Sequence, residues 1–269
     1  MKSKLPAIPY LLWMAVFTII PLGLIVVFAF TADDGSFTLV NLSKITEYGS
    51  VFGKSLWLAF VATAICLILA YPFAYIISRM APHRQSTYYM LAVLPMWMNF
   101  LLRTYAWMTL LENNGLINKF FGLFGLGPFT MINTSGAVVL GMVYDYIPFM
   151  VLPLYSVMVK IDNNVIQAAQ DLGAGTTNVM TKVVIPLSMP GIRTGITMVF
   201  VPSVSTFIIS RMLGGGSSIL IGDLIEQFFG TAYNLHLGSA ISLVLMVIVL
   251  VIMTVTNQFD DEEVGEMIK

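Results

Sequence analysis

Residues 55–78 read SLWLAFVATAICLILAYPFAYIIS and include no charged side chain before Arg79 follows. A helix needs roughly 20 predominantly apolar residues to cross the hydrocarbon core of a bilayer. Because this run exceeds that length, it predicts a transmembrane helix that ends near the first cation.

Five other long apolar runs accompany this one. Together they predict six spans, at about residues 8–30, 55–79, 86–111, 134–160, 193–211 and 237–259. Arg103 interrupts the third span, Asp145 interrupts the fourth, and the fifth is the shortest. We therefore predict an all-α polytopic membrane protein in which residues 1–269 form a single transmembrane domain. An even number of spans places both termini on the same side of the membrane.

The composition of the whole chain excludes other classes of protein. Of the 269 residues, 58% are hydrophobic and 10% are charged, whereas ordinary soluble domains are about 25% charged. The net charge of −1 offers no basic surface for nucleic acid, and a mean hydropathy of +0.87 suits neither a soluble nor a disordered chain. The single cysteine, Cys66, excludes an intramolecular disulfide and a cysteine-rich metal site.

Lysine and arginine in short loops indicate which side of the membrane is cytoplasmic. With the N-terminus inside, eight cations fall in inner segments and four in outer segments. The inner ones are Lys2, Lys4, Arg79, Arg84, Lys160, Lys182, Arg193 and Lys269, and the outer ones are Lys44, Lys54, Lys119 and Arg211. This excess predicts cytoplasmic termini. The first apolar run is longer than the ~7–15-residue core of a signal peptide, so we expect an uncleaved span.

The inner segment 161–190 contains the pattern of a short helix. Asp162 or Asn163 is suited to cap a helix that continues to Leu172, and Gly173 is suited to end it. A second short helix over residues 176–184 is expected to stop at Pro186. Such a compact element between the fourth and fifth spans can pass the pressure of a docked partner to both spans.

No motif for nucleotide binding or catalysis is complete. Residues 49–55, GSVFGKS, resemble a phosphate-binding loop, but they have three residues between the glycines where that motif needs four. His83 and His236 are isolated, and no HExxH or GxSxG pattern occurs. We expect no catalytic residue, no metal ligand and no enzymatic activity in this chain.

Asp145 is an acidic residue near the middle of the fourth span, where a carboxylate costs roughly 2.5–3.5 kcal/mol on insertion scales. Pro148 and Pro153 free the backbone carbonyls of Tyr144 and Phe149, which suits a path for cations. A structural ion pair or hydrogen bond with a neighbouring helix explains the residue equally well. If Asp145 lines a path, Asp145→Asn impairs uptake and leaves assembly intact.

Arg103 lies in the third span, nearer its outer end. We expect its side chain to extend outward, or to pair with Glu112 or with a partner chain.

Other candidates for a substrate pathway are polar or aromatic. Ser203 and Thr206 share one face of the fifth span, where hydroxyl groups either line a pathway or bond to a neighbouring helix. Asp223 and Glu226 share a helical face in the apolar stretch 219–229, which we expect to re-enter the membrane or to lie at its surface. The full candidate set is Asp145, Tyr144, Tyr146, Ser203, Thr206, Asp223, Glu226, Trp107 and Tyr105.

The inner segment also carries residues at a recognisable spacing. These are Gln167, Ala168 and Ala169, then Gly173 after three residues, and Val183, Ile185 and Pro186 after nine more. The pattern resembles the EAA loop of ABC importer permeases, which is Glu-Ala-Ala, three residues, Gly, nine residues, Ile-x-Leu-Pro. The resemblance implies that the listed residues couple the chain to an ATPase. Gln167 stands where the family has glutamate, so a hydrogen bond from this position to the ATPase would lack the negative charge of a carboxylate.

Three further stretches extend the resemblance to nearly the full length of the chain. They are LLRTYAW at 101–107, PFMVLPLY at 148–155 and LIGDLI at 220–225, and they are similar to B-type permease subunits of spermidine/putrescine importers. In agreement with a cationic substrate, the predicted outer segments carry six acids against four bases. Asp145 and the neighbouring tyrosines would bind such a substrate by charge and by cation–π contact.

The resemblance implies a type I importer in the bacterial inner membrane. This chain and a C-type permease would form the pathway, and two copies of a cytoplasmic ATP-binding subunit would bind ATP and Mg. An extracytoplasmic polyamine-binding protein would deliver the substrate, and this chain would need no cofactor of its own. Two alternatives stay open: a permease for aminoethylphosphonate, iron, thiamine or sulfate, and a stand-alone secondary transporter.

Overall fold

The computed structural model describes residues 8–267, which fold into helices joined by short connections; Lys2, Lys4 and Lys269, which count toward the predicted orientation, lie outside that range. The first half comprises α1 (Ile8–Met14), η2 (Ala15–Ile19), α2 (Ile20–Ala29), α3 (Val40–Lys44), η3 (Ile45–Tyr48), α4 (Gly49–Ser78), α5 (Pro82–Val93), η4 (Leu94–Trp97), α6 (Phe100–Leu111) and α7 (Leu116–Gly122). The second half comprises α8 (Ser135–Met158), α9 (Asn163–Asp171), α10 (Thr176–Val179), η5 (Met180–Val184), α11 (Ile185–Ser205), α12 (Ile208–Gly214), α13 (Ile221–Gly230) and α14 (Leu235–Met267).

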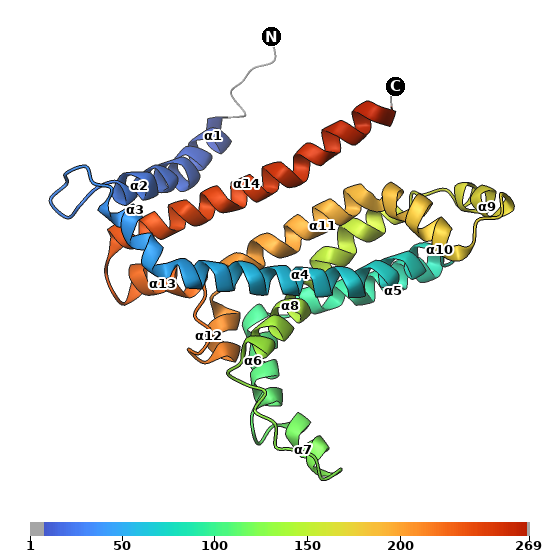
Figure 1. Cartoon of the computed structure of the whole chain (residues 1–269), viewed down its shortest axis with the longest axis horizontal. Helices are drawn as coiled ribbons and strands as arrows, with labels where there is room; N and C mark the ends of the chain where they lie inside the picture. The colour runs from blue at the N-terminus through green and yellow to red at the C-terminus, as the bar shows by residue number, and fades with distance from the viewer. Residues whose placement is uncertain (1–7, 268–269) are drawn as a thin grey trace.

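Five helical stretches within the described range are long and apolar enough to cross a membrane. They are Pro9–Ala29, Val40–Ser78, Ser135–Met158, Thr176–Ser205 and Leu235–Thr256. They lie at the positions predicted for the first, second, fourth, fifth and sixth spans. Figure 1 shows α4, α8, α11 and α14 running between two ends of the molecule, with α3 and α13 at one end and α9 and α10 at the other.

The predicted third span is not one helix. It consists of α5, the 3₁₀ turn η4 and α6, with extended backbone at Met98 between them. Pro95 lacks an amide donor and so interrupts the helical bonding. Asn99 then starts a new helix, because its side chain accepts hydrogen bonds from the amides of Leu101 (2.8 Å) and Leu102 (3.4 Å). The count of six spans stays a prediction.

The predicted fifth span also differs, because Pro186 does not stop the preceding helix. The helix begins at Thr176, passes through the π turn η5 and continues as α11 to Ser205. In η5 the amide of Ile185 bonds to the carbonyl of Met180, five residues back. The wider turn accommodates the proline, and an X-Pro pair follows η2 in the same way, at Ile20 and Pro21.

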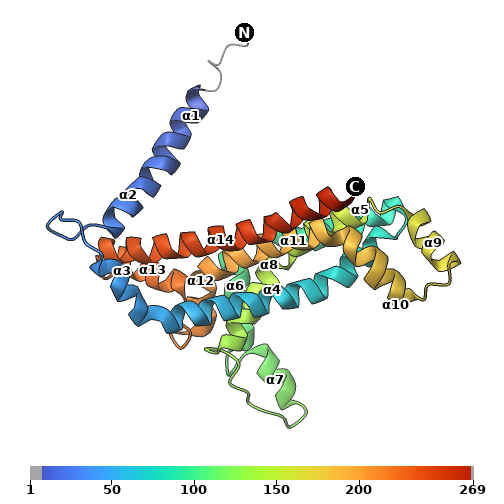
Figure 2. The same ribbon diagram turned by 45° about the horizontal axis from the view of Figure 1, so that its top comes forward.

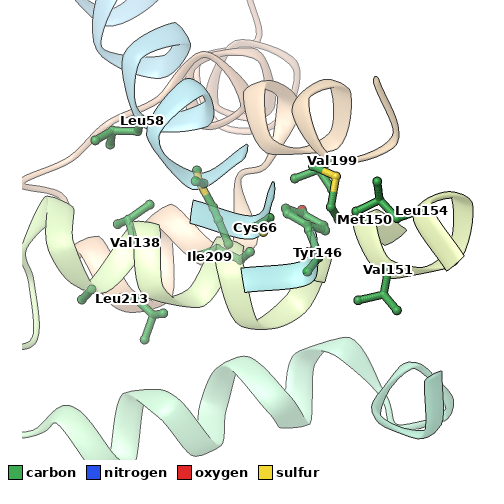
Figure 3. Close-up of a cluster of buried hydrophobic side chains, with 14 of the residues drawn as sticks. Leu58, Cys66, Val138, Tyr146, Met150, Val151, Leu154, Val199, Ile209 and Leu213 are labelled. Carbon is green, nitrogen blue, oxygen red and sulfur yellow. The ribbon is translucent and has the colours of Figure 1, made fainter. Parts of the chain in front are cut away.

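Helices α4, α8 and α11 form the main core. Figure 3 shows Cys66 of α4, Tyr146 and Met150 of α8, and Val199 of α11 meeting in this cluster. Small residues allow the close approach, since a β-carbon added to Gly191 of α11 would lie 2.9 Å from the carbonyl oxygen of Pro153 in α8. Gly191 and Gly195, one turn apart in α11, therefore serve helix packing against α8.

The first helices lie apart from this core. Helix α2 packs against the beginning of α14, and Figure 2 shows α1 inclined away from the other long helices. This arrangement leaves most of the α1–α2 surface facing the surroundings.

A glycine exchange tests the close packing of α8 and α11. We expect Gly191→Ala to lower the thermal unfolding midpoint of the detergent-solubilised protein, since the new methyl group would displace backbone at a cost of roughly 1–3 kcal/mol. Gly53→Ala in α4 is the matched control, because no atom lies within 4 Å of its added β-carbon. Equal midpoints for the two variants would contradict this packing.

Candidate functional site

Helix α9 forms a discrete element at one end of the helical bundle, as the sequence predicts. The carboxylate of Asp162 accepts a hydrogen bond from the amide of Asn164 at 2.9 Å and so caps the helix. At its other end, Gly173 adopts a left-handed conformation with φ of +84°, which a residue with a side chain rarely adopts. Both ends of α9 are therefore fixed by residues that the sequence singles out.

The inner face of α9 rests on a small cluster of its own. Ile166 is buried together with Val179 of α10 and Val184 of η5, and Tyr75 of α4 packs on the same cluster. Since α10, η5 and α11 form one continuous helical stretch, this cluster joins α9 to the beginning of the stretch that contains α11.

The outer face of α9 is exposed and largely uncharged. Gln167 and Ala168 are exposed, and Ala169 is half-buried. Val165 and Leu172 are 46% and 89% exposed, so α9 presents apolar side chains that nothing in the described chain covers. Of the residues farther along, Val183 and Ile185 are half-buried and Pro186 is exposed.

Asp145 is buried in an ion pair. Its Oδ1 lies 3.3 Å from Nε of Arg103, and the exposed fractions of the two side chains are 1% and 6%. The hydroxyl of Thr104 donates to Oδ2 at 3.2 Å. The pair joins α6 to α8, so Arg103 neither extends outward nor pairs with Glu112, contrary to prediction. Because neither side chain reaches water, the two opposite charges form an ion pair inside the helical bundle.

Of the aromatic candidates, Tyr146 is buried in the core, whereas Tyr144, Trp107 and Tyr105 are half-buried or exposed. The rings of Tyr144 and Trp107 meet edge to face at 5.5 Å, and the guanidinium of Arg103 lies 6.0 Å from the centre of the Tyr144 ring. Tyr105 is exposed at 55%. Tyr146 is buried in the core, with its hydroxyl oxygen 3.5 Å from the Pro202 carbonyl oxygen.

Of the two hydroxyl candidates in the fifth span, Ser203 bonds within its own helix, whereas the side chain of Thr206 forms a hydrogen bond with Tyr146 of α8. Ser203 is fully buried and donates to the carbonyl of Val199 at 2.6 Å. Thr206, also buried, lies just after the end of α11. The hydroxyl group of Ser203 therefore has its hydrogen-bond acceptor within α11.

Asp223 and Glu226 share a pocket of about 320 Å³ beside α12 and α13, at the end of the bundle away from α9. Oδ2 of Asp223 accepts from the amide of Leu220 at 2.9 Å, and Glu226 forms an ion pair with Arg211. Burial raises the pKa of Asp223, whereas the hydrogen bond from Arg211 lowers the pKa of Glu226. Glu226 is thus paired with a cation, whereas within residues 8–267 no lysine or arginine side chain forms an ion pair with Asp223.

The pairing of Arg103 with Asp145 and that of Arg211 with Glu226 were not predicted from the sequence. Arg103 and Asp145 are the charged residues that interrupt two otherwise apolar spans, and charge balance in lipid was the signal that could have joined them. Arg211 carried no comparable signal, because its partner lies across the glycine-rich turn 214–216.

The fold is that of a multi-spanning membrane permease. It superposes on a chain of a bacterial ABC transporter that imports the acidic polysaccharide alginate, with a TM-score of 0.80, 14% identity and coverage of 94% of this chain and 93% of the other. A chain of a bacterial alginate ABC transporter in complex with an alginate pentasaccharide-bound periplasmic protein gives a TM-score of 0.78 with 15% identity, covering 93% of this chain and 91% of the other. At this identity the likeness concerns the fold alone.

Comparison of the sequence defines the family. Residues 86–261 match the binding-protein-dependent transport system inner membrane component family. The spermidine/putrescine transport system permease protein PotB of Haemophilus influenzae is 37% identical over 246 residues, 88% of this chain and 86% of that protein. PotB of Escherichia coli is 35% identical over 247 residues, 88% of this chain and 90% of that protein. The chain belongs to the family of binding-protein-dependent transport system inner membrane components, and it is a multi-pass protein of the inner membrane.

A single and a double variant test the buried ion pair. We expect Asp145→Asn to lower the free energy of unfolding by roughly 3–5 kcal/mol, because it leaves the Arg103 cation buried without a counter-charge. The double variant Arg103→Met with Asp145→Leu should recover most of that loss, since neither charge remains. The measurement is chemical or thermal unfolding in detergent. A stable Asp145→Asn protein would show that the pair contributes little.

Proposed function

We propose that this chain is the membrane-spanning subunit of an ATP-driven importer that moves polyamines, spermidine and putrescine, into the cell. The observation that carries the proposal is α9, a capped helix with an exposed uncovered face, which holds the Gln-Ala-Ala and glycine spacing of the coupling loop. The substrate class rests on relatives at 35–37% identity that are named for spermidine and putrescine transport.

In this proposal the energy comes from partner subunits. Two copies of a cytoplasmic ATP-binding subunit bind ATP and Mg, and one of them seats α9 in a groove on its surface. Both termini and α9 then face the cytoplasm. Gln167 donates or accepts a hydrogen bond there, where the family glutamate would add a charge. A second permease of the C type completes the pathway and covers apolar surface that this chain leaves open.

Substrate enters from the opposite side, where an extracytoplasmic polyamine-binding protein releases it. Asp223 and Glu226 line a pocket at the end of the bundle away from α9, and this pocket would receive an ammonium group. Tyr105, Trp107 and Tyr144 offer aromatic faces to a polyamine farther along. The charge of Asp145 is already balanced by Arg103, so its contribution is to hold α6 against α8.

Uptake measurements test the substrate class. We expect proteoliposomes that hold the assembled complex and its binding protein to accumulate labelled spermidine and putrescine only with ATP. Unlabelled polyamine should suppress this signal, whereas aminoethylphosphonate and thiamine should not. Competition by aminoethylphosphonate in place of polyamine would contradict the proposed substrate.

Two substitutions on α9 test the coupling role. Ala168→Lys places a long cation on the exposed face, so we expect the ATP-binding subunit to co-purify with this variant at least tenfold less. Gln170→Lys introduces the same side chain two residues along, about 200° around the helix, and is the matched control. Equal recovery of the ATP-binding subunit with both variants would exclude α9 as the docking element.

A further inference from the structure

Arg79 lies at the end of α4, beside the connection between α8 and α9. Its Nη1 donates hydrogen bonds to the carbonyl of Ile161 at 2.9 Å and to the side-chain oxygen of Asn163, and its Nη2 donates to the carbonyl of Met158 at 3.1 Å. Met158 is the last residue of α8 and Asn163 is the first residue of α9. One guanidinium group therefore spans the whole connection.

The position of Arg79 suits the backbone that it contacts. The last carbonyl groups of a helix have no partner within the helix, and they carry partial negative charge. Arg79 follows α4 directly and contacts the end of α8, so its charge lies at the negative ends of two helices. The planar guanidinium presents donors from separate nitrogens in a fixed fork, whereas a lysine ammonium presents its three donors from a single nitrogen and so reaches acceptors that are less widely spaced.

Neighbouring side chains hold this corner together. The guanidinium of Arg79 lies 5.5 Å from the ring centre of Tyr75, which packs on the cluster beneath α9. Gln85 of α5 donates to the carbonyl of Met80 at 2.8 Å, and the hydroxyl of Tyr155 in α8 donates to Gln85 at 3.4 Å. The ends of α4, α5, α8 and α9 thus meet in one hydrogen-bonded corner.

We propose that Arg79 is a positioning residue for transport, which makes α9 move as one body with α4 and α8. The inference rests on the proposed function, in which ATP-driven closure displaces α9. Residues 159–162 form short turns, in which the amides of Lys160 and Ile161 bond to the carbonyls of Val157 and Met158, and Arg79 adds the bonds that tie this connection to α4. Without Arg79 we expect the connection to become a hinge. The hinge would absorb the displacement of α9 before it reaches the membrane-spanning helices.

The test compares Arg79→Met, Arg79→Lys and Lys160→Met in the complex with its ATP-binding subunits and second permease. Lys160→Met is the matched control, because it removes an exposed cation from the same connection. We expect Arg79→Met to reduce spermidine transported per ATP hydrolysed by about tenfold or more, because it removes all three hydrogen bonds that hold the connection. Arg79→Lys should fall between Arg79→Met and the wild type, and Lys160→Met should equal the wild type.

Hydrogen exchange on the same proteins gives a second readout. We expect amides of residues 159–166 to exchange faster in Arg79→Met than in Lys160→Met, with equal amounts of ATP-binding subunit co-purifying with both. Should Arg79→Met fail to assemble, Arg79→Lys decides by the same two measurements. An unchanged transport ratio and unchanged exchange in the variant that assembles would overturn the role of Arg79.

The two proposals fail in different ways. If the proposed function is wrong, the wild-type complex itself transports no spermidine and retains no ATP-binding subunit. If only the inference about Arg79 is wrong, the wild type transports spermidine and the Arg79 variants do so with the same yield per ATP.

Discussion

Lipid offers no hydrogen bonds, and this constraint explains the arrangement of the polar groups of this chain. Backbone groups in the hydrocarbon layer must be satisfied internally, so every predicted span is built of helices, and interruptions occur where another group takes over the bonding. Asn99 does this at the start of α6, and the π turn before Pro186 does it in the fifth span. Ser203 bonds to its own helix for the same reason.

The same constraint decides the role of the charged residues inside the bundle. Asp145 and Arg103 balance each other, and the balance ties the discontinuous segment α5–η4–α6 to α8. Helix α8 leads directly into the α9 connection, which Arg79 clamps to α4. Two arginines, one at the middle of α8 and one at its last residue, therefore connect it to its neighbours, and α9 is the part of this assembly that projects from it.

Local signals in the sequence predicted much of the fold. The uncharged run 55–78 predicted the membrane-spanning part of α4, and Asp162 with Gly173 predicted both ends of α9. Local signals failed where the outcome depended on distant partners. Considering each span by itself does not join Arg103 to Asp145, although charge balance between the two spans does. A proline rule does not predict that a π turn carries a helix past Pro186. The pairing of Glu226 with Arg211 likewise depends on how α12 and α13 fold back on each other.

The proposed function requires that α9 receive the force of an ATP-binding subunit. The only cysteine of the chain, Cys66, is fully buried, so a cysteine introduced by Ala168→Cys is the only accessible thiol in the described chain. We expect a short bifunctional reagent to cross-link this position to the ATP-binding subunit in membranes that take up spermidine, with a yield that changes when ATP is added. The absence of a cross-link in membranes that still take up spermidine would contradict the account.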